Sequence, residues 1–204
     1  MGTSNRLVVA SANGGKLKEI RRLFSGTAIE VMPQSEFGVV DAEETGANFC
    51  ENALLKARNA VTQTGYPSVA DDSGLEVDVL HGAPGIRSAR YAGEHATDAQ
   101  NIKKLLEALA DVPQEQRGAR FVCVMAYVEA EDTKPVICKG TWSGQIAGAP
   151  GGKGGFGYDP VFFVPEMNCT AAELDGETKN RLSHRGQALR LLLKALRSSD
   201  APER

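Results

Sequence analysis

The sequence predicts an α/β protein in which a mixed β-sheet is flanked by helices. Strand and helix patterns alternate along the first part of the chain, as they do in sheets with helical connections. Further along, two long strand patterns follow each other with only a short polar loop between them, which indicates a mixed sheet. The chain has 204 residues, 42% of them apolar and 24% charged, which is typical of a globular protein with a sizeable core.

The first expected elements are a buried strand, a loop and a helix. Residues 6–10 (R-L-V-V-A) are apolar enough for a buried strand, and the loop Ser11–Gly15 follows. A helix is expected from about Lys16 to Phe24, because apolar residues recur there at helical spacing. A second strand is expected near Ile29–Met32, where Pro33 ends it.

A longer helix is expected over about Ala47–Thr64, where apolar residues form one stripe. The acidic pair Glu43-Glu44 stands just before its expected start. Ser68–Asp71 is then expected to be a short strand and Leu75–Leu80 a further extended segment, with a sharp turn at Ser73-Gly74 between them.

The second half of the chain begins with a helix and continues with strands. Thr97 and Gln100 have the spacing of a capping box before a helix that runs to about Leu109. The remaining expected elements, in chain order, are the strands Arg120–Glu129 and Val136–Ile146, the glycine-rich loop Gly148–Gly157 and a terminal helix from about His184 to Leu196.

Composition excludes some classes of protein. The net charge of −3 and the pI of about 5.7 disfavour a nucleic-acid-binding protein, which would be expected to be basic. No apolar run approaches the ~20 residues that span a bilayer, and no secretion leader is visible. The four cysteines are widely spaced and form no C-x-x-C pair, so we expect reduced thiols in a cytoplasmic protein.

The segment from Ala70 to Gly93 carries the most informative group of charged residues. Asp71 and Asp72 end an apolar run, and a glycine- and proline-rich loop with Arg87 and Arg90 follows. Carboxylate oxygens suit Mg²⁺, and arginines bind phosphate oxygens in a bidentate fork, so a metal–phosphate site is one interpretation. The same Asp-Asp-Ser-Gly sequence is also typical of an ordinary turn, and this alternative stays open.

Three further segments could bind a ligand. The loop S-A-N-G-G-K leads into a helix, whose N-terminus attracts anions, although it is not a Walker A loop and could be a plain strand-to-helix connection. In G-G-K-G-G-F-G-Y-D-P, Phe156 and Tyr158 offer flat faces for a base and Asp159 an acceptor, unless the segment is a flexible hairpin. Lys179 precedes His184 and Arg185, two cationic residues at an unfavourable helix start.

Six motifs in one order give the chain a family resemblance. They are S-A-N-G-G-K-L-K-E, A-E-E-T-G-x-x-F-x-E-N-A-x-x-K-A, A-D-D-S-G-L-x-V-D, G-A-P-G-I-x-S-A-R-Y, G-G-F-G-Y-D-P-x-F and S-H-R-G-x-A-L. From about Leu7 to Leu196 the chain resembles the inosine triphosphate pyrophosphatase family in its bacterial form. Each motif alone is weak, whereas the ordered set is specific.

The resemblance implies an elongated, two-lobed single domain over residues 1–204, an active site in the cleft between the lobes, and a homodimer. It implies Mg²⁺-dependent hydrolysis of dITP, ITP and XTP to the monophosphate and pyrophosphate, which removes these nucleotides from the pool before they enter DNA or RNA. Asp72 would be the catalytic carboxylate and a metal ligand, with Glu43 or Glu44 as another ligand and Asp71 as a supporting carboxylate. The substrate-binding residues would be Ser11, Ala12, Asn13, Gly14, Gly15, Lys16, Lys56, Ser73, Phe156, Gly157, Tyr158, Asp159, Lys179, His184 and Arg185.

Other functions remain open at this point. The same scaffold could hydrolyse other nucleotides, such as modified pyrimidines or dUTP. A nucleotide-binding regulator without turnover is a second alternative, although a pure triphosphate sensor gains little from four extra carboxylates. A nucleic-acid-binding module is disfavoured by the acidic pI.

Overall fold

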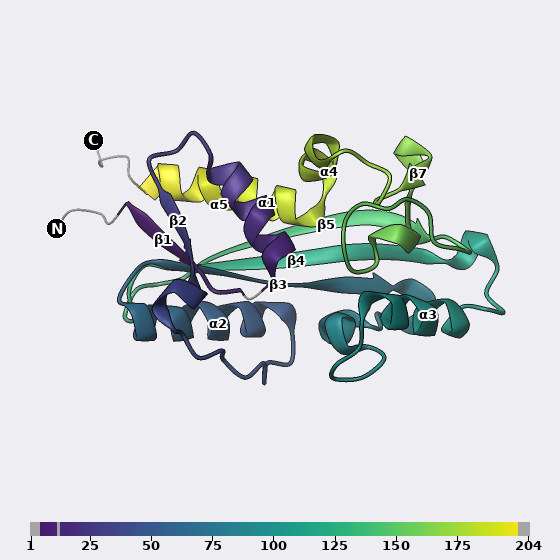
Figure 1. Ribbon diagram of the computed structural model, residues 1–204, viewed down its shortest axis with the longest axis horizontal. Helices are drawn as coiled ribbons and strands as arrows, with labels where there is room; N and C mark the ends of the chain where they lie inside the picture. Colours follow the sequence, from purple (N-terminus) through teal and green to yellow (C-terminus); the bar gives the residue numbers. More distant parts are fainter. Residues whose placement is uncertain (1–4, 12, 200–204) are drawn as a thin grey trace. The chain divides into compact units, whose positions relative to one another are not determined.

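The computed structural model describes residues 5–11 and 13–199 of the chain. The strands are β1 (Arg6–Val9), β2 (Glu30–Pro33), β3 (Ser68–Val77), β4 (Gly118–Val128), β5 (Val136–Ile146), β6 (Phe162–Val164) and β7 (Cys169–Thr170). The α-helices are α1 (Gly14–Phe24), α2 (Phe49–Thr64), α3 (Asp98–Ala108), α4 (Gly176–Leu182) and α5 (His184–Ser199), and short 3₁₀ turns connect several elements (Figure 1).

The predicted mixed α/β architecture is confirmed. Within the described residues, the strands form a seven-stranded sheet in the order β2-β1-β3-β4-β5-β6-β7. β1 pairs in parallel with β2 and β3, whereas β6 pairs antiparallel with β5 and β7. Among the described helices, none is both long and apolar enough to cross a membrane.

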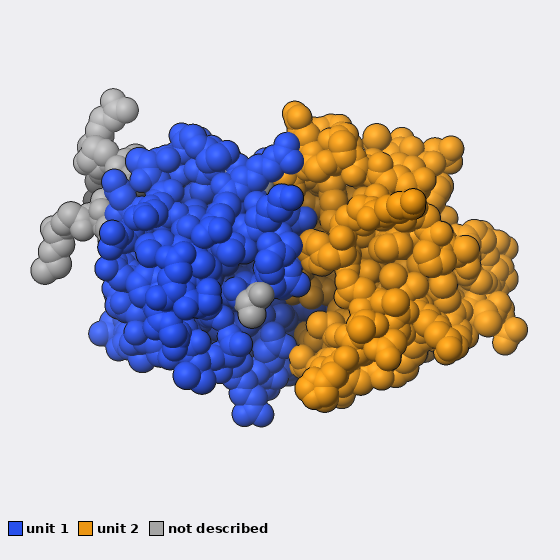
Figure 2. All heavy atoms as spheres, in the orientation of Figure 1, with its two compact units in different colours: residues 1–72, 123–140, 185–204 blue, residues 73–122, 141–184 orange. Residues whose placement is uncertain are grey.

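The chain divides into two compact units, which Figure 2 shows in blue and orange. Unit 1 comprises residues 1–72, 123–140 and 185–204, and unit 2 comprises residues 73–122 and 141–184. Strands β3, β4 and β5 each contribute residues to both units.

In unit 1, helices cover both faces of the strands. α1 and α5 lie on one face and α2 lies on the other (Figure 1). The α1/α5 face is packed by buried side chains from the strands and both helices, among them Leu7, Val69, Met125, Ile20 and Leu189. Burying each of these side chains stabilises the unit by roughly 1.5–3 kcal/mol, so the helices are held firmly on the sheet.

Unit 2 has its own core, which includes a group of aromatic side chains. The ring of Phe121 packs against those of Trp142 and Phe162, with centroid distances of 6.4 and 4.4 Å. α3 adds Ile102, Leu105 and Leu109 to this cluster. The expected capping box of α3 is present, because Thr97 and Gln100 bond each other's backbone.

Some predicted boundaries were wrong. The expected turn at Ser73-Gly74 is absent, because β3 continues through both residues to Val77 and only Asp78–Leu80 leave the strand as a 3₁₀ turn. β3 lies between β1 and β4 in the sheet, and pairing to neighbours outweighs the turn preference of these two residues. α2 begins at Phe49 with Asn48 as its cap, so Glu43 and Glu44 stand in the preceding loop and not at the helix start.

Candidate functional site

Asp71 and Asp72 are consecutive residues of β3, so their side chains point to opposite faces of the strand. Asp71 shares its face with Val69, which packs in the α1/α5 core. Asp72 points toward α2, where it contacts Lys56 and Asn52. The alternation of a single strand therefore separates two adjacent carboxylates into two different environments.

Asp71 lies in a buried cluster of ions. Its Oδ2 atom is 2.9 Å from Nζ of Lys16 and accepts a hydrogen bond of 3.3 Å from Nε of Arg185. Arg185 also donates from Nη1 to Glu19 at 2.5 Å. Burial alone would raise the pKa of Asp71, but attraction to Lys16, Arg185 and Lys56 holds the pKa well below its usual range. Asp71 is therefore a permanent anion that joins α1 to the start of α5.

Asp72 lies in a second cluster, which is centred on Lys56. The Lys56 ammonium donates to Oδ1 of Asp72 at 2.8 Å and to Oε1 of Glu44 at 3.0 Å. Burial raises the pKa of Asp72, and attraction to Lys56 opposes this rise without cancelling it. Burial would lower the pKa of Lys56, but Asp72, Asp71 and Glu44 together raise it. Lys56 is thus a fully charged ammonium, and Asp72 is a better proton acceptor than an exposed aspartate.

The loop before α2 is fastened along the helix, which explains why Glu44 reaches Lys56. Asn59 and Gln63 of α2 both donate to the carbonyl oxygen of Val40, at 2.8 and 2.9 Å. Nearer the start of the helix, Oδ1 of Asn52 accepts from the backbone N–H of Gly46 at 2.8 Å. The loop therefore runs antiparallel to α2 and brings Glu44 level with Lys56, whereas the side chain of Glu43 is exposed.

The loop before α1 has the form expected of an anion-binding helix start. Asn13 caps α1, because its Oδ1 accepts from the backbone N–H of Lys16 at 3.1 Å, and its own N–H donates to Oγ of Ser11. The helix begins at Gly14, two residues earlier than expected. Free backbone N–H groups at such an end attract anions. Ala12, which was also expected to bind substrate, lies outside the described residues.

In unit 2, the segment 156–159 is held by buried polar contacts. Asp159 pairs with Lys179 at 2.5 Å and accepts the backbone N–H of Phe156 at 2.8 Å. The Lys179 ammonium lies over the ring of Phe156, 4.9 Å from its centroid. The backbone N–H of Gly157 donates to Asp98 of α3 at 2.6 Å. Asp159 is thus an internal anchor of this segment, and Phe156 and Lys179 are the side chains it positions.

Tyr158 and His184 are buried in unit 2. Tyr158 is 4% exposed and donates from its hydroxyl to the backbone oxygen of Ser88 at 2.9 Å. Burial raises the pKa of this hydroxyl well above its usual range. The ring of His184 stacks on that of Phe121 with a centroid distance of 4.7 Å. The idea that Tyr158 offers a flat face to a base disagrees with this burial.

Three further residues that the sequence singled out lie in unit 2. Ser73 is a partly buried residue of β3 and not part of a turn. Arg87 and Arg90 lie in a 3₁₀ segment, where each forms a long pair with Glu94, at 3.8 and 4.0 Å. The side chain of Arg87 is exposed, and such exposed pairs contribute little to stability.

Sequence reasoning missed three residues that belong to the two clusters around Asp71 and Asp72. Glu19 binds Arg185, Asn52 connects Asp72 to Gly46, and the thiol of Cys123 lies 3.9 Å from Oδ2 of Asp71. Asn52 could have been found, because it interrupts the apolar stripe of α2 and is fully buried. Glu19 and Cys123 gave no such signal, because their roles depend on contacts between distant segments.

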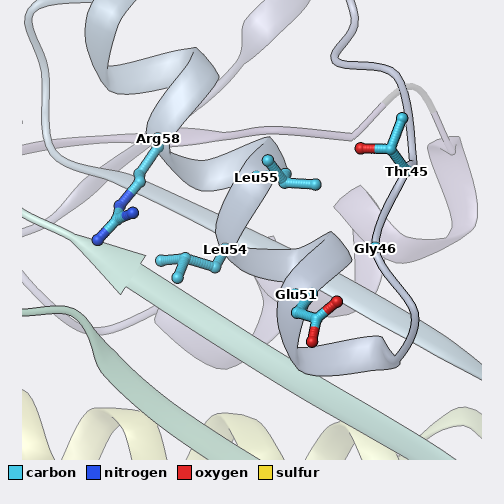
Figure 3. A pocket seen from close by; sticks show the side chains of 6 residues that line it. All are labelled: Thr45, Gly46, Glu51, Leu54, Leu55 and Arg58. Atoms are coloured by element: carbon cyan, nitrogen blue, oxygen red, sulfur yellow. The ribbon is translucent and has the colours of Figure 1, made fainter.

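A pocket of about 300 Å³ lies beside the Glu44 loop, between that loop and the outer side of α2 (Figure 3). It is lined by Thr45, Gly46, Glu51, Leu54, Leu55 and Arg58. None of the residues expected to bind substrate or metal lines it, and the chemistry of the two carboxylate clusters lies elsewhere. In residues 5–11 and 13–199, no group of three or more His, Cys, Asp or Glu side chains could hold a metal ion by itself.

Comparison with known proteins gives matches over nearly the whole chain. Residues 7–195 match the Ham1 family. A dITP/XTP pyrophosphatase of Photorhabdus laumondii is 54% identical over 95% of this chain and 99% of that protein, and one of Escherichia coli K12 is 56% identical over 95% and 98%.

Comparison with solved structures points to the same family. A HAM1 protein from Coxiella burnetii matches with a TM-score of 0.88 and 52% identity, over 95% of this chain and 98% of that one. The Ham1 protein of Staphylococcus aureus matches with a TM-score of 0.85 and 43% identity, over 96% and 100%. The resemblance found in the six motifs is confirmed, and the chain belongs to the Ham1 family.

Proposed function

We propose that this protein hydrolyses non-standard purine nucleoside triphosphates, namely dITP, ITP and XTP, to the monophosphate and pyrophosphate. The observation that carries the proposal is the pair of carboxylates Asp72 and Glu44, which converge on one buried ammonium in the same unit as the α1 N-terminus. Acid next to fixed cations and free N–H groups is the chemistry that a metal–triphosphate complex needs. The names of the relatives, dITP/XTP pyrophosphatases, support the same substrates.

The triphosphate binds at the start of α1. The N–H groups of Gly14 and Gly15 and the positive end of the helix attract phosphate oxygens, and Lys16 adds a positive charge. Lys56 supplies a second ammonium to the same anion. Asp71 keeps Lys16 and Arg185 in place through its two charged contacts and is a positioning residue.

The metal is Mg²⁺, held by Asp72 and Glu44. These two carboxylates fit that ion, which is usually bound by one or two protein carboxylates, with water and substrate phosphates completing its shell. The lack of a third acidic or histidine ligand among the described residues agrees with a metal that arrives with the nucleotide. When bound, Mg²⁺ supplies charge neutralisation at the phosphates.

Asp72 acts as the general base. Its burial raises its pKa, which improves its capacity to accept a proton from water. The water oxygen attacks the α-phosphorus, the bond from the α-phosphorus to the bridging oxygen breaks, and pyrophosphate leaves with the bonding electrons. Lys16 and Lys56 stabilise the charge that develops on the leaving group.

The base binds at the unit 2 segment 156–159. Phe156 offers a ring for stacking and Lys179 a cationic donor, and Asp159 binds both the Lys179 ammonium and the backbone N–H of Phe156. The 6-oxo group of hypoxanthine and xanthine accepts hydrogen bonds from such donors, as from the backbone near Tyr158 or from His184. Adenine carries an amine at this position and would leave the donors unpaired, which is heavily penalised. Arg185 is assigned to Asp71 instead of the base, because its guanidinium binds two carboxylates.

We also infer that both units act as one catalytic domain over residues 1–204, that Ser73 contacts substrate, and that the protein works as a cytoplasmic homodimer. The family resemblance supports each of these points. The four cysteines are free thiols, in agreement with a reducing compartment.

Hydrolysis in ¹⁸O-labelled water tests the reaction directly. Attack at the α-phosphorus puts the label into dIMP and leaves pyrophosphate unlabelled, which mass spectrometry of both products would show. Label in pyrophosphate, or release of dIDP and orthophosphate, would contradict the proposed bond cleavage. A second candidate, a pyrophosphatase for dUTP, predicts the same labelling but a different preferred base.

A further inference from the structure

Lys56 lies between the two carboxylates that are assigned to the metal. Its Nζ atom is 2.8 Å from Oδ1 of Asp72 and 3.0 Å from Oε1 of Glu44, and only 16% of its side chain is exposed. An ammonium therefore binds one oxygen of each carboxylate that the proposed function assigns to the metal. In the proposed function Lys56 binds the triphosphate, whereas in this structure it binds the two carboxylates.

We propose that Lys56 is a surrogate cation, which neutralises part of the charge of Glu44 and Asp72 in the nucleotide-free protein and competes with the divalent metal ion for them. The ion then binds well only when a triphosphate offers Lys56 other anionic partners. This inference rests on the proposed function, because it takes Glu44 and Asp72 as the metal ligands.

Charge sets the two cations in competition. Two carboxylates with one ammonium leave a net charge of −1, which attracts a divalent ion far less than two carboxylates without an ammonium do. Lys56 donates to one oxygen of each carboxylate, so an ion held by Glu44 and Asp72 would compete with the ammonium for the same two side chains.

The neighbouring contacts indicate that Lys56 is the part that moves. The Glu44 loop is fastened to α2 by Asn52 and by the bonds of Asn59 and Gln63 to Val40. Asp72 is a residue of β3 and also contacts Asn52, at 3.5 Å. The carboxylates therefore keep their places without Lys56, whereas the lysine has a flexible four-carbon stem and three donors.

Binding of metal and of triphosphate should consequently be coupled. A triphosphate that takes Lys56 away raises the affinity for the ion, and by thermodynamic linkage the ion raises the affinity for the triphosphate by the same factor. Replacing the lysine by a neutral side chain removes the competition, so part of this coupling is lost.

The test is a Mn²⁺ titration of the nucleotide-free protein, with free Mn²⁺ measured by electron paramagnetic resonance. We expect Lys56→Met to bind Mn²⁺ about tenfold more tightly than the unchanged protein, because the competing charge is gone. Lys56→Gln is the second variant, in case the first fails to fold by circular dichroism. Arg58→Met is the matched control, since it removes one positive charge from the same helix without touching Glu44 or Asp72, and it should change the affinity by less than about twofold.

Equal or weaker Mn²⁺ binding in both Lys56 variants would overturn the proposal. A second titration with the non-hydrolysable α,β-methylene analogue of ITP separates this failure from a failure of the proposed function. If Asp72→Asn leaves Mn²⁺ binding with the analogue unchanged, the metal assignment is wrong and this inference falls with it. If Asp72→Asn weakens it but the Lys56 variants gain nothing, the metal assignment stands and only the surrogate role is overturned.

Discussion

At the scale of single residues, the protein puts two neighbouring aspartates to different uses. Asp71 is enclosed by Lys16 and Arg185, which keep its pKa low, and Asp72 lies beside one shared ammonium, where burial raises its pKa. The direction of each side chain follows from strand alternation alone. The difference between a structural anion and a proton acceptor thus depends on which helix each side chain faces.

Replacing Asp72 by Asn should remove most of the activity. The amide keeps the shape of the side chain but cannot accept the proton of water. We expect the rate of hydrolysis to fall by roughly 10²–10⁴-fold, as is typical for loss of a general base. The measurement is pyrophosphate release from dITP under saturating conditions. Turnover close to that of the unchanged protein would rule out this role for Asp72.

Asp71→Asn should act on stability. Its side chain is fully buried, so the change removes the carboxylate that Lys16 and Arg185 share, and breaking a buried pair in this way costs about 3–5 kcal/mol of unfolding free energy. Urea unfolding followed by circular dichroism measures it. Glu30→Gln breaks the exposed pair with Arg6 and serves as the control, with an expected loss below about 1 kcal/mol. Similar losses in both variants would contradict the buried cluster.

Cys123 should resist thiol reagents in the folded protein. Burial, with a contribution from Asp71, raises the pKa of this thiol to about 12, and only the thiolate reacts. Because the pKa of this thiol is higher in the folded protein than in the unfolded chain, the neutral thiol favours folding. This contribution to stability is complete below the ordinary thiol pKa and is lost as the pH rises toward about 12. Mass spectrometry after iodoacetamide treatment at about pH 8 should find Cys123 unmodified until urea is added. Rapid labelling without urea would contradict this environment.

At the scale of elements, the site depends on a loop fastened to a helix and on an unbroken strand. The sequence predicted α2 and the acidic pair before it, but not that the loop runs back along the helix. That path depends on the amide side chains of Asn52, Asn59 and Gln63, and a periodic pattern does not show which atoms of the loop they bind. The turn expected at Ser73-Gly74 was wrong for a related reason, because turn preferences are local and the pairing of β3 in the sheet is not.

Gly46→Ala should displace this loop. A Cβ atom at Gly46 would lie 2.6 Å from Oδ1 and 2.9 Å from the backbone N of Asn52, which is too close for the present arrangement. Glu44 would then lose its position beside Lys56, and we expect activity to fall about tenfold or more, with a larger requirement for Mg²⁺. Gly148→Ala is the control, since a Cβ atom there would lie 3.9 Å from its nearest neighbour, Nη1 of Arg117. Equal activity of both variants across a Mg²⁺ titration would argue against the loop's role.

At the scale of the whole molecule, the sequence predicted the class of fold better than it predicted the short elements and the contacts between distant segments. The alternation of strands and helices and the two long strands indicated a mixed sheet, and the six motifs indicated the family. The sequence did not predict the short strands β6 and β7 or helix α4, because each spans too few residues to show a periodic pattern. The sequence predicted that Arg185 binds the substrate, because a cation at the start of a helix is locally unfavourable and such positions tend to be functional. Its binding to Asp71 and Glu19 depends on segments far apart in sequence.

Selectivity for non-standard purine bases distinguishes the proposed function from its alternatives, and pyrophosphate release measures this selectivity directly. The panel is dITP, XTP, dGTP, dATP and dUTP, each with Mg²⁺ and then with EDTA. We predict fast release confined to dITP and XTP and abolished by EDTA. Preferred hydrolysis of dUTP or dATP, or release that persists in EDTA, would contradict the account.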